Sequence, residues 1–92
     1  MNMEQKLFWA EIKRIQDFVV NVSLAKYSSY NNVEDLLNDV TYETIYRLME
    51  LIDGVGNNSI RGELVNISSG NCINLGIELH DYCEEYLKCS DI

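Results

Sequence analysis

The first part of the chain carries apolar residues in alternating steps of four and three, the spacing of one face of a helix. The residues of this seam are Phe8, Ile12, Ile15, Val19 and Val22. Asn2, followed three residues later by Gln5, forms a capping-box pattern at its start. The sequence therefore predicts a helix over residues 3–25. Residues 18–24 also alternate as they would in a strand, so helix and strand both stay open for that stretch.

A second helix is predicted over residues 33–53. Asn32 and Asp35 form a cap pattern at its start, and Gly54 stands where a glycine commonly ends a helix. The apolar stripe changes phase near residues 38–41, where four poor helix formers follow one another. This change predicts a kink or a fresh helix start at that point.

The last third of the chain has a different pattern. Two short apolar stretches flank Ser68-Ser69-Gly70-Asn71, which predicts a β-hairpin over residues 60–75. A last helix is expected over residues 77–88, with acids in its first turn and Lys88 in its last. The sequence thus predicts one small domain over residues 1–92, α+β but mostly α, with three main helices and one β-hairpin in the order α-α-β-β-α.

Charge is unevenly distributed along the chain. The net charge of the 92 residues is -8. Residues 1–27 hold four bases and three acids, whereas residues 28–92 hold three bases and twelve acids. A surface this acidic repels phosphates, so we expect no direct nucleic-acid binding and a protein partner that is itself basic.

Cysteine content and hydropathy bear on the compartment. The three cysteines, Cys72, Cys83 and Cys89, are an odd number, so at least one thiol stays free. The first residues mix charges into the apolar positions and do not resemble a secretion signal. An apolar run of about 18 residues, as a membrane span needs, does not occur. We therefore expect a cytoplasmic protein that does not bind a membrane.

His80 and Cys83 are the residues that most invite a chemical role. They lie one helical turn apart and share a face, so a metal site or a Cys-His nucleophile pair can be considered. A structural zinc site needs further paired ligands, and a nucleophile needs oxyanion donors, which the pattern does not supply. We expect both residues to pack against the core, and we expect no catalytic residue, metal or cofactor, and no enzyme.

Gly54 and Gly56 raise the question of a phosphate-binding loop. They follow a helix instead of preceding one, and no lysine accompanies them. A helix C-cap explains this pair better.

Paired tyrosines beside acids predict a partner-binding surface. Tyr42 with Tyr46, and Tyr82 with Tyr86, are four residues apart and have acidic neighbours. Tyrosine is enriched at protein interfaces, and an acidic surface suits a basic partner. The predicted residues are Tyr42, Glu43, Tyr46, Asp81, Tyr82, Glu85 and Tyr86. The alternative, that these tyrosines line the edge of the core with their hydroxyls in water, stays open.

The seam of the first helix also resembles a coiled-coil stripe and predicts self-association, with a homodimer as its simplest form. The same residues would make this contact: Phe8, Ile12, Ile15, Val19 and Val22.

Our main hypothesis is a small acidic cytoplasmic module that binds or regulates another protein without catalysis. Variants of it are inhibition of a basic, nucleic-acid-handling partner and a phage or mobile-element origin. The alternative is a self-assembling structural or scaffold protein that oligomerises through the first helix.

Overall fold

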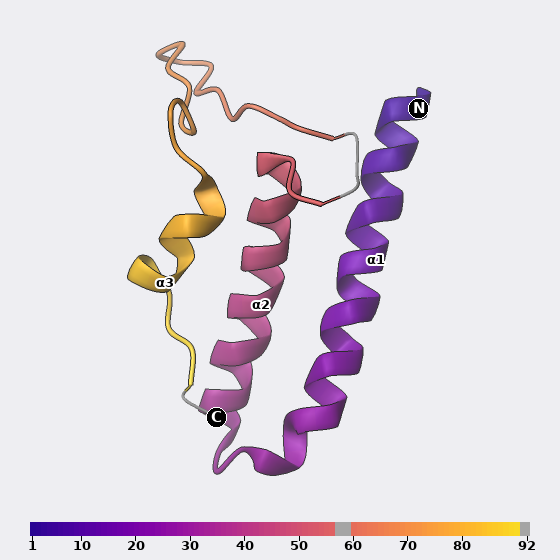
Figure 1. Ribbon diagram of the computed structural model, residues 1–92, viewed down its shortest axis with the longest axis vertical. Coiled ribbons are helices and arrows are strands. Elements are labelled where there is room, and N and C mark those ends of the chain that lie inside the picture. The colour runs from indigo at the N-terminus through magenta and orange to yellow at the C-terminus, as the bar shows by residue number, and fades with distance from the viewer. Residues whose placement is uncertain (57–59, 91–92) are drawn as a thin grey trace.

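Two long antiparallel helices form the body of the protein (Figure 1). The structure is a computed structural model that describes residues 1–56 and 60–90. Helix α1 spans Met3–Lys26, and helix α2 spans Val33–Asp53. The short 3-10 helix η1, Tyr27–Ser29, lies between them. A long connection then leads to the 3-10 helix η2, Leu79–Tyr82, and the one-turn helix α3, Cys83–Tyr86, which lie beside α2 on the side away from α1.

Helix α1 begins at the capping box that the sequence contains. The Asn2 side chain accepts a hydrogen bond from the Gln5 amide, and the Gln5 side chain accepts one from the Asn2 amide, both at 2.8 Å. Glu4 in the first turn and Lys26 in the last lie where the helix dipole favours their charges. Residues 18–24, for which helix and strand both stood open, are helical.

Helix α2 begins where the Asn32 side chain accepts a hydrogen bond from the Asp35 amide, and it ends at Gly54, whose φ is 79°. Of the kink or restart predicted near residues 38–41, the restart is wrong, because α2 runs through them without a break. Thr41 donates its hydroxyl to the carbonyls of Leu37 and Asn38 inside the helix. Asp39, which would have capped a new helix, instead binds residues far away in the sequence.

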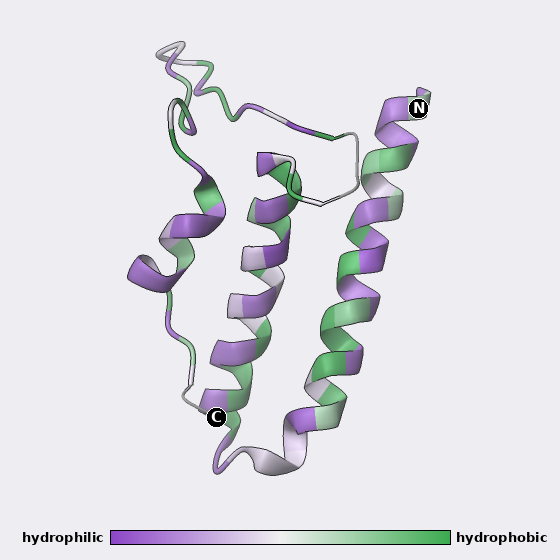
Figure 2. Ribbon diagram, in the orientation of Figure 1, coloured by the Kyte–Doolittle hydropathy of each residue, from purple (hydrophilic) through white to green (hydrophobic). Residues whose placement is uncertain are grey.

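The core lies between α1 and α2 and is small. Its buried residues are Ile15, Val19 and Leu51, and the partly buried Phe8 and Leu48 pack against them with three others. Figure 2 shows apolar positions along α1 and along the side of α2 that faces it. Such a core fits a short chain, which buries a smaller fraction of its surface than a long one. Among the helices of the described residues, none is both long and apolar enough to cross a membrane.

The predicted α+β class and its hairpin are wrong, because residues 1–56 and 60–90 contain no β-strand and the fold is all-helical with three helices. The expected turn does form, since Gly70 has a φ of 77°, and a single antiparallel bridge joins Val65 and Cys72. Strand pairing stops there because the Leu64 amide donates its hydrogen bond to the Asn74 side chain. In a longer hairpin this amide would bond to the opposite strand. The apolar side chains of the segment are largely exposed, with Ile67 at 95%, so a lone pair of strands gains little stability.

The last helix is much shorter than the predicted 77–88, since only η2 and α3, Leu79–Tyr86 together, are helical. Its start is delayed because Glu78 is extended and the next two amides bind Asp53 of α2. Its end comes early because Leu87 is extended, with φ −114° and ψ 151°. From there the chain leads Ser90 to Asp39 of α2.

Because the core has so few members, each of them matters for stability. We expect Leu51→Ala, at a residue that is 2% exposed, to lower the free energy of unfolding by about 2 to 4 kcal/mol. Leu75→Ala makes the same change at a residue that is 79% exposed and should leave stability within about 0.5 kcal/mol of the parent. Urea unfolding followed by circular dichroism measures both, and equal effects would contradict the assigned core.

Candidate functional site

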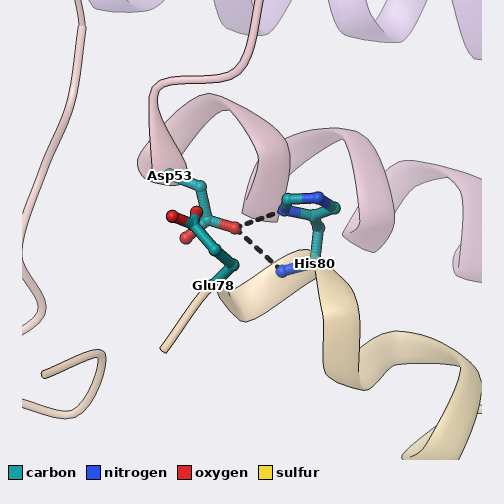
Figure 3. Close-up of side chains that lie close together, drawn as sticks. All are labelled: Asp53, Glu78 and His80. Carbon is teal, nitrogen blue, oxygen red and sulfur yellow. Dashed lines mark hydrogen bonds and ion pairs between the residues drawn. The ribbon is translucent and has the colours of Figure 1, made fainter. Parts of the chain in front are cut away.

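Asp53, at the end of α2, holds the C-terminal segment in place. Its side chain is 1% exposed. One carboxylate oxygen accepts a hydrogen bond from the Leu79 amide and the other accepts one from the His80 amide, both at 2.9 Å. These amides begin η2, so Asp53 caps η2 from another element. Figure 3 shows the Asp53 carboxylate directed at His80.

The His80 ring forms an ion pair with the same carboxylate. Its Nδ1 lies 2.6 Å from Asp53 Oδ2, and its ring meets the Tyr46 ring edge-on at 5.7 Å. The hydrogen bond to Asp53 raises the pKa of His80 above its usual 6.5, burial opposes this, and the charges of Asp81, Asp53 and Glu50 add to it. Burial acts to raise the pKa of Asp53, but hydrogen bonds from His80 and Leu79 outweigh it, so the pKa lies below its usual 3.8. The pair therefore favours imidazolium facing carboxylate.

Asp53, Glu78 and His80 form the one group of potential metal ligands in the described part of the chain (Figure 3). Each offers an atom within 4.8 Å of the others, and one histidine with two carboxylates is a donor set that zinc accepts. The donors already have protein partners, however: both Asp53 oxygens accept amides, and Glu78 lies 3.8 Å from the Arg61 guanidinium. A buried carboxylate satisfied in this way acts as a structural clamp.

Cys83, which the sequence placed beside His80, does not belong to this group. It is buried at the start of α3, and burial, followed by the charges of Asp53 and Glu50, raises the pKa of its thiol. A thiol with a raised pKa is a poor nucleophile. The residue that the sequence analysis missed is Asp53. An acid in the last turn of a helix opposes the helix dipole, and this was the available sign that it has other partners.

Asp39 forms a second clamp, nearer the start of α2. It accepts hydrogen bonds from the Tyr30 hydroxyl at 2.7 Å and from the amide and hydroxyl of Ser90. The hydrogen bond to Asp39 raises the pKa of Tyr30 to about 12. Asp39 and Asp53 thus tie both ends of the segment from Leu79 to Ser90 to one helix.

Between the two clamps the chain presents an acidic, tyrosine-bearing surface. We call it the acidic tyrosine face and define it as Asp81, Tyr82, Glu84, Glu85 and Tyr86, all of which are exposed. The Tyr82 and Tyr86 rings lie 6.5 Å apart, and Tyr86 is 75% exposed. Within the described residues, neither glutamate of this face has an ion-pair partner. Four of its members, Asp81, Tyr82, Glu85 and Tyr86, belong to the partner-binding set that the sequence predicted.

The other three predicted partner-binding residues lie on α2 and are half-buried. Tyr42 and Tyr46 stack with ring centroids 6.1 Å apart, and burial raises the pKa of both hydroxyls. Glu43 binds Arg47 at 2.8 Å, and the Arg47 guanidinium lies 4.7 Å from the centre of the Phe18 ring of α1. The structure therefore places these three in contacts within the chain and leaves the C-terminal four accessible.

The predicted self-association seam faces α2 of the same chain. Ile15 and Val19 are buried there, Phe8 and Ile12 pack against them, and Val22 is half-buried. The exposed apolar residues of α1 lie beside this seam. Trp9 and Val20 are 57% and 50% exposed, and they border an apolar groove of about 550 Å³ between the two helices. We call it the α1–α2 groove.

The clamp at Asp53 predicts how stability depends on pH. The raised pKa of His80 means that its contribution is complete below its ordinary pKa of 6.5 and is lost as pH rises through the raised value. The lowered pKa of Asp53 means that its contribution is complete above 3.8 and is lost as pH falls through the lowered value. We expect the free energy of unfolding, measured with urea under reducing conditions, to decline as pH rises above about 6.5.

His80→Gln should remove most of this alkaline decline and also weaken the acid-side dependence, because the His80 ring is one of the groups that lower the pKa of Asp53. The chain has a single histidine, so the difference between parent and variant isolates its titration. Glu85→Gln, at an exposed residue of the same segment, should keep the decline. If the stability of His80→Gln declined with the same slope, the decline would have to come from the titration of another group.

No protein-family model, curated protein or solved structure matches this chain. Function must therefore be argued from the clamps, the acidic tyrosine face and the α1–α2 groove themselves.

Proposed function

We propose that the protein is a non-catalytic binding module that docks its acidic tyrosine face on a basic surface of another protein. The observation that carries this proposal is the pair of clamps. A segment with little helix of its own is fixed at Asp53 and at Asp39, and the exposed residues lie between these two points. A surface held in place before binding loses less conformational entropy when a partner arrives.

The charges of the face support a basic partner. Glu84 and Glu85 are exposed, and so is the Asp81 side chain, whose Oδ1 lies 3.4 Å from Nε2 of the His80 ring. The twelve acids and three bases of residues 28–92 add a long-range field of the same sign. Such a field attracts a basic protein from a distance and increases its rate of association.

The tyrosines support contact over and above charge. Tyr82 and Tyr86 present two neighbouring rings beside the carboxylates, and tyrosine combines a large apolar surface with a hydroxyl that forms hydrogen bonds. Interfaces are enriched in such side chains, and the most important contacts often include them. A partner with lysines or arginines around an apolar patch would complement this face.

We place the module in the cytoplasm, where three free cysteines would stay reduced. If the partner binds nucleic acid, the exposed carboxylates of the face would compete with phosphates for the same basic site. In that case the module would act as an inhibitor of its partner. The alternative of self-assembly is favoured by a different surface, the α1–α2 groove.

The test compares partner capture by the parent and by Glu84→Gln/Glu85→Gln, with bound proteins quantified by mass spectrometry. We expect the parent to retain basic proteins at about 50 mM salt and lose them at about 500 mM, where the Debye length falls from about 14 Å to about 4 Å. The double variant should retain at least about tenfold less of them, because both substitutions remove charge from the contact.

Glu34→Gln/Glu63→Gln is the matched control. It removes the same charge from two exposed glutamates outside the face and should bind like the parent. An equal loss of captured proteins in both double variants would mean that binding depends on net charge alone and not on this face. Capture that neither variant changes, or that survives high salt, would contradict the proposal.

A further inference from the structure

The α1–α2 groove is an apolar surface that the rest of the described chain does not cover. All of its lining residues belong to the two long helices, and α3 lies on the far side of α2 (Figure 1). Trp9 and Val20 stand at its α1 edge, while Val40 and Leu48 line its α2 side. Exposed tryptophan next to a continuous apolar surface is unusual for a protein that works as a monomer.

The total exposed surface of the chain is larger than that of an ordinary folded monomer. A folded monomer of 10.6 kDa exposes about 5500 Å². This chain exposes 7002 Å², which leaves an excess of about 1500 Å². Its radius of gyration of 15.1 Å likewise exceeds the value of about 12 Å expected for 92 residues. A stable dimer of standard size covers about 800 Å² on each copy, well within this excess.

We infer that the α1–α2 groove is covered by a second copy of the same chain, so that two helical hairpins form a four-helix bundle. The charge distribution favours a second copy over a basic partner protein at this groove. Residues 1–27 hold four bases and three acids, so α1 is the segment that two copies of an otherwise acidic chain bring together with least repulsion. The groove lining contains Lys13 and no carboxylate, so a basic protein would gain no charge attraction there.

The positions on α1 are compatible with a two-fold axis. In an antiparallel pair of α1 helices that cross near Ile15, Trp9 of one copy lies opposite the region of Val20 of the other. The same crossing places Lys13 of one copy opposite Asp17 of the other. Within one chain these two residues form an exposed ion pair of 2.9 Å, so they can exchange partners across the axis without loss of charge pairing.

Sedimentation equilibrium on the full chain, under reducing conditions and over a range of concentrations, tests this inference. We expect the parent to be a dimer and Val20→Lys to raise the dimer dissociation constant about 100-fold, because each dimer would bury two new charges. Val65→Lys is the matched control. It replaces the same residue type at the same 50% exposure outside the groove and should leave the dimer intact.

Trp9 fluorescence provides a second readout, because the chain has a single tryptophan. Dilution of the parent through the dissociation constant should shift the emission to longer wavelength and increase quenching by acrylamide. Val20→Lys should keep the exposed spectrum up to about 100-fold higher concentrations, while its helical circular dichroism stays that of the parent. A parent that is monomeric with an exposed Trp9 throughout, or a dimer that Val20→Lys and Val65→Lys weaken equally, would overturn the inference.

High salt separates this inference from the proposed function. Dimerisation through an apolar groove should persist at about 500 mM salt, where binding through the acidic tyrosine face is screened. Glu84→Gln/Glu85→Gln should weaken partner binding and leave the dimer unchanged. Loss of the dimer in that variant would contradict the assignment of the two activities to two surfaces.

Discussion

The carboxylate of Asp53 accepts hydrogen bonds from two backbone amides and from the His80 ring, and the position of η2 and α3 beside α2 depends on these contacts. Helix α3 has four residues, far fewer than an isolated helix needs to persist in water. Its stability must therefore come from contact with α2. A buried acid at the end of α2 has an unfavourable interaction with the dipole of that helix, which three directed hydrogen bonds offset. The segment is thus fixed mainly by polar contacts, with Cys83 as its buried apolar residue.

The spacing of the two clamps also explains why the segment cannot be one continuous helix. Asp39 and Asp53 are 14 residues apart on α2, which corresponds to about 21 Å along its axis. Their partners His80 and Ser90 are 10 residues apart, and an uninterrupted helix of that length would reach only about 15 Å. The chain must therefore leave the helical conformation between the clamps, and it does so at Leu87. The early end of α3 follows from where the two aspartates stand on their own helix.

Features with local causes could be predicted from the sequence, and features with distant causes could not. The capping residues Asn2 and Asn32, and Gly54 at the end of α2, act on residues no more than four positions away. The roles of Asp39 and Asp53 depend on residues 51 and 27 positions later, which no local pattern shows.

The prediction of a hairpin was wrong for a related reason. Its turn chemistry was correct at Gly70, but a sheet also needs a surface to pack on, and none reaches Val65 or Ile67. In the candidate site, the sequence drew attention to Tyr82 of η2 and Tyr86 of α3, which are exposed, whereas it did not predict the clamp at Asp53.

The two proposed surfaces lie on different parts of the chain, and this arrangement makes them compatible. The α1–α2 groove is uncharged apart from Lys13, and the acidic tyrosine face lies beyond α2, on the side away from α1. Two copies joined through their grooves would keep both acidic faces outward, because each face repels the other. Such a dimer carries twice the net charge of -8 and two equivalent docking faces. A partner with two basic sites, or two partners side by side, would then be bound with the advantage of high local concentration. Self-association would in this way strengthen binding through the arrangement of two faces, without any further contact between residues.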